Sequence, residues 1–311
     1  MKSIIKILYH RISLMVAAIL VQIAVLIAVF SAFSDYFITY YWVSIVISII
    51  VVVVIINSKS NPSYKIVWII PVLIFPVFGA LFYLLLGGKK LSKKERNKMA
   101  ANTQKILETL KHQEENLKEI REQNESAYVI SKYIQDYGFY PPFKNTVSEY
   151  LSLGEKKFEK LKEELKKAKH YIFLEYFIIN EGVMWDSILD ILLEKVREGV
   201  DVRIIYDDFG CLLTLPYKYN EKLERMGIKC CVFNPIMPIL STKINNRDHR
   251  KIVVIDGHTA FTGGINLADE YINEIEKYGH WKDAAIMLKG EAVLNMTVMF
   301  LSLWDYLRGI E

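Results

Sequence analysis

The stretch RDHRKIVVIDGHTAFTGGIN, residues 247–266, decides both the fold and the chemistry of this chain. Its apolar run IVVI ends in Asp256 and Gly257, which predicts a buried strand that enters a tight turn. Residues two apart on a strand share a face, so His249 and Lys251 are expected to project to the same side. The stretch therefore predicts a histidine beside a fixed positive charge, next to a buried strand.

Two glycines and an asparagine complete the stretch: Gly263, Gly264 and Asn266. Glycine has no side chain, so the backbone is expected to approach an anion closely here, and the Asn266 amide adds a further donor. Together with Lys251, these residues predict a phosphate-binding site that contains His249. Six residues at fixed spacing indicate a site far more strongly than a lone histidine would.

The pattern HxKxxxxDxxxxxxGGxN resembles the signature of the phospholipase D superfamily at every fixed position. Outside this stretch, the chain resembles bacterial cardiolipin synthases over nearly the whole of residues 36–305. The segments that carry this resemblance are WIIPVLIFPVFGALFYLLLG, FLEYFIIN, GVDVRIIYDDFG and YGHWKDAAIMLKGEAV. The resemblance implies a phospholipase D-like fold and the exchange of one phosphodiester for another.

The residue types of the stretch suit phosphodiester chemistry without a metal or a cofactor. Lys251 supplies a point charge for phosphate oxygens, and a neutral His249 attacks phosphorus to form a covalent phosphohistidine. A second acid must protonate the leaving alkoxide, because one histidine cannot fill both roles at once. The superfamily resemblance implies a second such motif across a pseudo-twofold axis, and this sequence holds one. We expect the second half from a C-terminal region missing from this sequence or from a homodimer, which leaves open whether His249 is nucleophile or acid.

Further carboxylates are candidates for the site. By the family's pattern, Asp283 is the carboxylate that orients the His249 imidazole, and the alternative is a surface aspartate after a turn. Asp256 is either a catalytic member of the signature or a residue that fixes the turn through its short side chain. Glu175 and Asp207 lie at strand positions that the family also uses, with roles that the resemblance does not define.

The composition points to a membrane. Hydrophobic residues make up 52% of the chain and the mean hydropathy is +0.19, which is too apolar for an ordinary soluble protein. Three uncharged segments account for the excess: 12–33, 36–56 and 66–86. The first two are long enough, as helices that rise ~1.5 Å per residue, to cross a hydrocarbon core of ~30 Å. The third contains Pro71, Pro76 and Gly79, which suit a kinked span and a re-entrant hairpin equally well.

The charges that flank these segments predict the topology. The first segment is too long for a signal-peptide core, so we expect a retained anchor. Basic residues lie on both sides: Lys2, Lys6 and Arg11 before the first segment, and Lys89, Lys90, Lys93, Lys94, Arg96 and Lys98 after the third. The larger cluster predicts a multi-pass protein of the cell membrane whose C-terminal domain faces the cytoplasm. Three cysteines that cannot all pair fit a reducing compartment.

The chain is predicted to have three parts: a membrane anchor over 1–90 with two or three transmembrane segments, a charged helical connector over 91–128, and a first phospholipase D-like catalytic repeat over 129–311. In the catalytic part, strands are predicted at 171–179, 200–208, 228–233, 252–255 and 284–288. Helices are predicted at 155–169, 184–198, 218–226 and 291–304. The fold class is therefore α/β, a mixed sheet flanked by helices and preceded by an α-helical transmembrane region.

These features favour a membrane-bound phosphatidyltransferase. It would take the phosphatidyl group of phosphatidylglycerol onto His249, release glycerol, and pass the group to a second phosphatidylglycerol to give cardiolipin. The expected partners are phospholipid and the membrane, and not nucleic acid, because acidic residues are scattered through 149–208 and the strongest basic cluster adjoins the membrane. Two alternatives stay open: a phosphodiester hydrolase, either a lipid phospholipase D or a nuclease, and a catalytically silent half that acts as a membrane scaffold.

Overall fold

The computed structural model describes residues 11–32, 36–87, 93–236 and 246–309. Among these residues the chain divides into two compact units: one made of residues up to 87 together with residues 236 and 246, here called the N-terminal unit, and a larger unit made of residues 93–235 and 247–309. Part of the predicted basic flanks falls outside the described residues, namely Lys2, Lys6, Lys89 and Lys90. Residue 33, the predicted end of the first apolar segment, and the predicted boundary at 90–91 also lie outside them.

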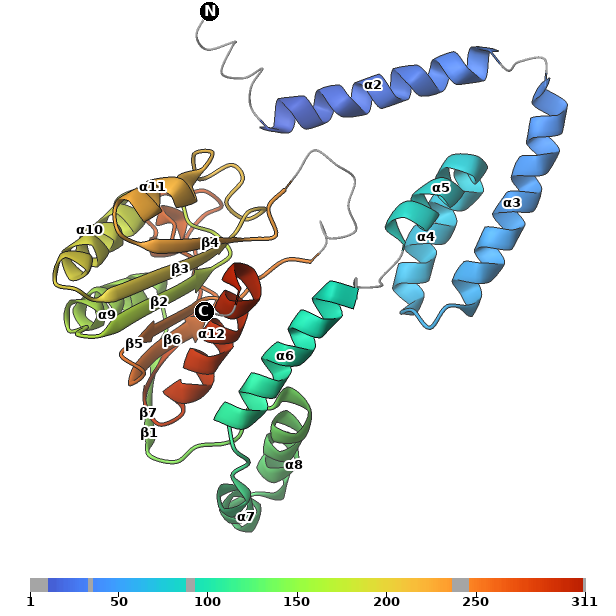
Figure 1. The fold of residues 1–311 in the computed structure, drawn as a ribbon. Helices are drawn as coiled ribbons and strands as arrows, with labels where there is room; N and C mark the ends of the chain where they lie inside the picture. Colours follow the sequence, from blue (N-terminus) through green and yellow to red (C-terminus); the bar gives the residue numbers. More distant parts are fainter. Residues whose placement is uncertain (1–10, 33–35, 88–92, 237–245, 310–311) are drawn as a thin grey trace, which may run out of the picture. The chain divides into compact units, whose positions relative to one another are not determined.

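The N-terminal unit is helical where apolar segments were predicted (Figure 1). Helix α2 covers Arg11–Ala32 and helix α3 covers Phe37–Asn57. Within the described part of the chain, α3 is the one helix that is long and apolar enough to cross a membrane, over Ile38–Asn57 with a mean hydropathy of 2.6. Val46, Ile49 and Val53 are exposed along α3, which is typical of a helix that faces lipid rather than a protein core.

The third apolar segment forms a helical hairpin of α4 (Pro62–Ile74) and α5 (Pro76–Leu86). The chain leaves helical geometry at Phe75, because Pro76 disfavours a helical residue before it. The two helices then fold back on each other, with the Trp68 and Tyr83 rings 5.7 Å apart, and a Cβ at Gly79 would overlap the backbone of α4. With 13 and 11 residues, neither helix alone reaches across a hydrocarbon core of ~30 Å.

The larger unit begins with helices where the sequence suggested a single connector helix. These are α6 (Lys93–Thr109), α7 (Glu114–Gln123), α8 (Glu125–Tyr133) and the short π-helix η2 (Ile134–Gly138). Helix α6 packs on the C-terminal helix α12 (Val293–Arg308), where Lys105 pairs with Asp305 at 2.9 Å and Asn102 donates to the Ser302 carbonyl. The connector is therefore part of the larger unit and not a free spacer.

A seven-stranded mixed sheet, in the order β1-β7-β6-β5-β2-β3-β4, forms the centre of this unit (Figure 1). Strands β2, β3 and β4 are parallel, whereas β5, β6, β7 and β1 run antiparallel to their neighbours. The strands are β1 (Thr146–Leu151), β2 (Tyr171–Tyr176), β3 (Asp201–Asp207), β4 (Lys229–Phe233), β5 (Ile252–Ile255), β6 (Thr259–Gly263) and β7 (Ala285–Gly290).

Helices cover both faces of the sheet. One face packs against α12 through a core that includes Phe173, Val254 and Phe300. The other face packs against α9 (Gly154–Lys166) and α10 (Val183–Arg197), with Leu161 and Trp185 fully buried. Two short helices complete the unit, α11 (Tyr219–Arg225) and the 3-10 helix η4 (Asp269–Ile272). All four residues of β5 are buried because the strand lies between two helical layers.

The predicted fold class, an α/β domain with a mixed sheet, is confirmed. Each predicted strand and helix of the catalytic part has a counterpart, and the strand at 252–255 has the predicted bounds. Asp256 and Gly257 have φ of 51° and 63°, so they form the tight turn that the Asp-Gly pair predicts between β5 and β6. Strands β1 and β6 were not predicted. Strand β1 is an edge strand whose central four residues are exposed and carry no buried alternation, and β6 is a short run, TAFTG, that ends in a glycine.

Candidate active site

His249 and Lys251 lie just before β5, at the end of the sheet where β2 and β3 finish. Both side chains contact the ring of Phe177, which follows β2. The His249 ring centroid is 4.8 Å from the Phe177 centroid, and Lys251 Nζ is 5.4 Å from the same centroid. The imidazole is exposed, whereas Lys251 is only 5% exposed. The structure therefore places an accessible histidine beside a recessed ammonium, both against the Phe177 ring.

The Lys251 side chain is hydrogen-bonded to the backbone of His249. Its Nζ donates to the His249 carbonyl oxygen at 2.7 Å. Burial lowers the pKa of Lys251, and the carboxylates of Asp248 and Asp283 partly offset this effect. An ammonium with few hydrogen bonds and little water around it retains donors for an incoming anion.

Asp207 fixes the segment that carries His249. It is fully buried at the end of β3, and its carboxylate accepts from the Asp248 amide at 2.9 Å and from Arg247 Nη1 at 3.2 Å. The same carboxylate accepts from the amides of Phe209 and Gly210. One side chain thus joins the end of β3 to the start of the catalytic stretch, which gives Asp207 a positioning role that the sequence had left undefined.

A second polar cluster lies on the opposite side of the same segment. Arg250 Nε is 2.7 Å from Glu175 Oε1 and 3.0 Å from Asp248 Oδ1. Burial raises the pKa of Glu175 well above its usual range, Arg250 opposes the rise, and the neighbouring Asp248 adds to it. The raised pKa favours the protonated form of Glu175. Asp248 and Arg250 alternate with His249 and Lys251 along the chain. This cluster therefore fixes the segment from the side opposite His249 and Lys251.

The two glycines make room for Asp283. A Cβ at Gly264 would overlap both carboxylate oxygens of Asp283, and a Cβ at Gly263 would overlap the Ala284 carbonyl. The Gly264 amide is used within the sheet, since it donates to Ala284 at 3.1 Å. The structure thus brings Asp283 to the glycine pair, where a side chain would exclude it. Asp283 Oδ1 accepts from the Ala284 amide at 2.7 Å, and within the described residues no hydrogen bond joins it to His249.

Asn266 lies behind the site. It is 1% exposed, its Oδ1 accepts from the Ile178 amide at 3.0 Å, and its Nδ2 donates to Tyr271 Oη at 2.7 Å. The structure places its amide within a network that fixes the chain after β2 to the chain after β6. The second N–H of the Asn266 amide has no partner in this network. Because the side chain is buried, a phosphate could accept from this N–H only if the surrounding chain moved.

Asp256 lies at the other end of β5 from His249, about 20 Å away for seven residues of extended chain. Its carboxylate accepts hydrogen bonds from three consecutive amides: Lys169 at 2.8 Å, His170 at 2.8 Å and Tyr171 at 2.9 Å. Burial alone would raise the pKa of Asp256, but these three amides outweigh it and lower the pKa. Of the two roles that the sequence left open, this geometry supports the structural one.

One residue near the site gave no sequence signal. Lys157 falls within the charged helix GEKKFEKLKEELK, where a lysine normally indicates a solvated face. In the structure it is 2% exposed and donates to Tyr176 Oη at 2.8 Å, at the end of β2 next to Phe177. Only the packing of α9 against the sheet reveals this burial, because the next residue along the helix, Lys156, is exposed.

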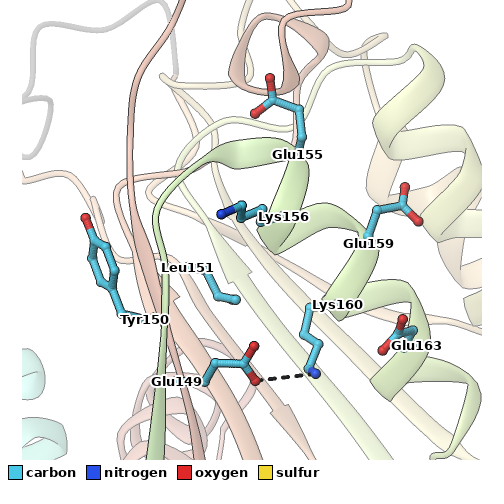
Figure 2. Close-up of a pocket in the computed structure, with 8 residues that line it drawn as sticks. All are labelled: Glu149, Tyr150, Leu151, Glu155, Lys156, Glu159, Lys160 and Glu163. Atoms are coloured by element: carbon cyan, nitrogen blue, oxygen red, sulfur yellow. Dashed lines mark ion pairs between the residues drawn. The ribbon is translucent and has the colours of Figure 1, made fainter.

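A pocket of about 480 Å³ lies elsewhere, between β1 and α9. Figure 2 shows its lining side chains, among which Lys160 pairs with Glu149 at 3.3 Å. Four glutamates and two lysines line it, together with Tyr150 and Leu151, and none of the predicted site residues is among them. We assign no chemistry to it, because its charged groups are largely solvated and it holds no nucleophile. In the described part of the chain, no group of three His, Cys, Asp or Glu is arranged to hold a metal ion.

Comparison with known proteins gives two family matches. Residues 161–304 match the family described as "Cardiolipin synthase, PLD-like domain", and residues 46–88 match the family described as "Phospholipase D-nuclease N-terminal". The chain is 45% identical to an uncharacterized protein of Streptococcus mutans over 81% of this chain and 54% of that protein. It is 35% identical to cardiolipin synthase 2 of Bacillus anthracis over 81% of this chain and 49% of that protein.

The chain spans about half the length of the curated relatives that it matches. Among solved structures, NucT from Helicobacter pylori aligns with a TM-score of 0.42 at 12% identity, over 52% of this chain and 98% of that one.

Proposed function

Because this chain belongs to the phospholipase D superfamily, with a domain of the cardiolipin synthase type, we propose that it is a membrane-bound phosphatidyltransferase. It transfers the phosphatidyl group of one phosphatidylglycerol to the hydroxyl of a second, which yields cardiolipin and releases glycerol. The observation that carries this proposal is the exposed His249 imidazole beside the recessed Lys251 ammonium. No energy source is needed, because one phosphodiester replaces another.

The chemistry proceeds in two displacements. A neutral His249 attacks the phosphorus of the donor lipid, the P–O bond to glycerol breaks, and glycerol leaves as its alkoxide takes a proton from an acid. The acceptor hydroxyl then attacks the phosphohistidine, loses its proton to that same group, and restores His249. Lys251 binds the non-bridging oxygens in both steps, and Asp283 orients the imidazole once substrate closes the site. Gly263 and Gly264 admit Asp283, and Asn266 supports the phosphate end of the site.

The acid is a second histidine, supplied either by a further repeat or by a second copy of this chain. If the roles are reversed, His249 is the acid and the other histidine is the nucleophile. The apolar helices α2 to α5 hold the site at the lipid surface, with the larger unit on the cytoplasmic face and more than one crossing of the cell membrane.

The test is direct. The chain is reconstituted into vesicles that contain phosphatidylglycerol with a labelled glycerol headgroup, and lipid products and free glycerol are followed. We expect cardiolipin and glycerol in equal amounts, and a His249→Ala variant with at least a ~1,000-fold lower rate. His258→Ala is the matched control, because His258 is also exposed but lies at the turn beyond β5.

Other outcomes separate the alternatives. Phosphatidic acid as the main lipid product would identify a hydrolase, because water would then be the acceptor. Absence of turnover in wild-type protein that is folded and inserted would contradict the transferase proposal for this chain and favour a silent half.

A further inference from the structure

Lys157 is a buried ammonium without an ion-pair partner in the part of the chain that the structure describes. Its single hydrogen bond goes to Tyr176 Oη at 2.8 Å, and no carboxylate lies within 4.0 Å of its Nζ. Burying a charge without a partner destabilises a fold, and an apolar side chain of similar length would avoid the cost. Packing alone therefore does not explain why a lysine occupies position 157.

The carboxylate that acts on Lys157 through space is Asp283. It raises the pKa of Lys157, which burial lowers to about 7, and it also raises the pKa of Lys251. The same carboxylate therefore acts electrostatically on both Lys157 and Lys251. The titratable groups that face Lys157 are Tyr176 from β2 and Asp283 from the segment before β7.

The charge balance around Lys251 depends on this arrangement. Two carboxylates act on Lys251, Asp248 and Asp283. Asp248 has a cation of its own, since Arg250 Nε lies 3.0 Å from its Oδ1. Asp283 has no cation within ion-pair distance among the described residues. Without Lys157, the charges of Asp283 and Lys251 would cancel, and the site would lose its attraction for a phosphate.

Resting on the proposed function, we propose that Lys157 is a positioning residue of the phosphate site: its buried ammonium offsets the Asp283 carboxylate, so that Lys251 keeps its charge for the substrate phosphate. Lys157 touches no substrate. It acts on the Asp283 carboxylate through space. It also binds Tyr176, and the next residue, Phe177, carries the ring that contacts His249 and Lys251. The site therefore carries a net positive charge while Asp283 remains available to the imidazole.

The experiment measures anion binding and does not require turnover. Full-length protein in detergent micelles at pH 6 is treated with diethylpyrocarbonate, and carbethoxylation of the exposed His249 is followed by peptide mass spectrometry at increasing inorganic phosphate. Phosphate bound at Lys251 protects His249. In Lys157→Met we expect the half-protective phosphate concentration to rise at least ~5-fold. In Lys195→Met we expect no change, because Lys195 is also buried but pairs with Glu198 on α10, away from the site.

A double variant tests the mechanism. If Lys157 acts by offsetting Asp283, then Lys157→Met combined with Asp283→Asn should recover the phosphate affinity that Lys157→Met alone loses. A purely structural role for Lys157 predicts no such recovery. Lys157→Gln is examined alongside, and loss of folding in both single variants would show a structural requirement and overturn the proposal.

The outcomes separate this inference from the proposed function. Equal protection of His249 in wild type and folded Lys157→Met would overturn the role of Lys157 while leaving the phosphate site in place. Absence of protection in wild type at any phosphate concentration would overturn the phosphate site, and the proposed function with it.

Discussion

Asp256 accepts hydrogen bonds from three consecutive amides at the start of β2, and its own φ of 51° lies in the left-handed region. The signature aspartate thus acts on the backbone far from His249. Asp207 does the same at the other end of the sheet, where it accepts from the Asp248 amide. At the residue scale, the carboxylates of Asp256 and Asp207 fix both ends of the β5 segment by accepting hydrogen bonds from backbone amides.

Asp256→Ala should lower the free energy of unfolding by ~2–3 kcal/mol, because three amides lose their acceptor and alanine is strained at positive φ. Thermal unfolding of the detergent-solubilised protein would measure this. Asp256→Asn is the matched control and should cost less, since asparagine tolerates positive φ and keeps one acceptor oxygen. An unchanged unfolding temperature in Asp256→Ala would contradict the structural role.

Glu175 should make stability fall as the pH rises. Burial raises the pKa of Glu175 above the usual 4.5, so the folded state holds this proton at pH values where the unfolded chain has lost it. The stabilisation is complete below pH 4.5 and is lost as the pH rises through the raised pKa. Glu175→Gln keeps the shape and removes the titration.

We expect the unfolding temperature of wild type to decline from about pH 4.5 upward by more than that of Glu175→Gln, with the two curves furthest apart at the highest pH. Parallel curves would mean that Glu175 is ionised in the folded protein. Glu149→Gln is a suitable control, because Glu149 is exposed and lies on the edge strand β1.

At the scale of elements, the α4–α5 hairpin has a sharp test. Trp68 and Tyr83 are neighbours in the hairpin, with rings 5.7 Å apart, whereas in one continuous helix the two residues would be ~22 Å apart. In a cysteine-free background, a short bifunctional maleimide should link Trp68→Cys to Tyr83→Cys in membranes. The pair Tyr41→Cys with Ile56→Cys has the same spacing along the chain but lies within the single helix α3, so it is the control and should not be linked. Absence of the first crosslink would indicate a continuous span.

The sequence predicted the elements that depend on local signals. The apolar run of β5, the Asp-Gly turn and the amphipathic pattern of α9 and α10 are all short-range, and each is present. The pairing of His249 and Lys251 was predicted from strand periodicity, whereas in the structure both residues lie in the segment before β5 and their side chains meet at the Phe177 ring. Asp207, Glu175 and Lys157 could not be assigned a role, because each acts on a residue of another segment, 19 or more positions away. Such contacts exist only after the sheet forms.

The glycine pair illustrates the same limit. The sequence predicted that the backbone at Gly263 and Gly264 approaches an anion, namely a substrate phosphate. The approaching group in this structure is the carboxylate of Asp283, which lies in the segment just before β7, the strand that pairs with β6. A glycine in the sequence indicates that another group lies close to the backbone. The identity of that group, here Asp283, depends on how the strands pair.

At the scale of the whole molecule, one motif supplies half of the expected chemistry. If two copies each contribute a histidine, mixing wild type with inactive His249→Ala at equal amounts should leave about one quarter of the activity, because only pairs of wild-type chains are complete. Activity of mixed, reconstituted protein would be measured against the wild-type fraction, with the folded His258→Ala variant as the control for mixing. A linear fall to one half would contradict a shared site between copies.

Strand β5 is fixed at both of its ends. Asp256 ties the far end to the start of β2, and Asp207 ties the segment before the near end to the close of β3. Between them, four buried residues pair with β2 on one side and β6 on the other. The amides of residues 252–255 should therefore be among the slowest in the chain to exchange with deuterium, since they open only when the sheet itself unfolds. His249 therefore lies in a segment that is attached directly to β5 and fixed to the close of β3 by Asp207.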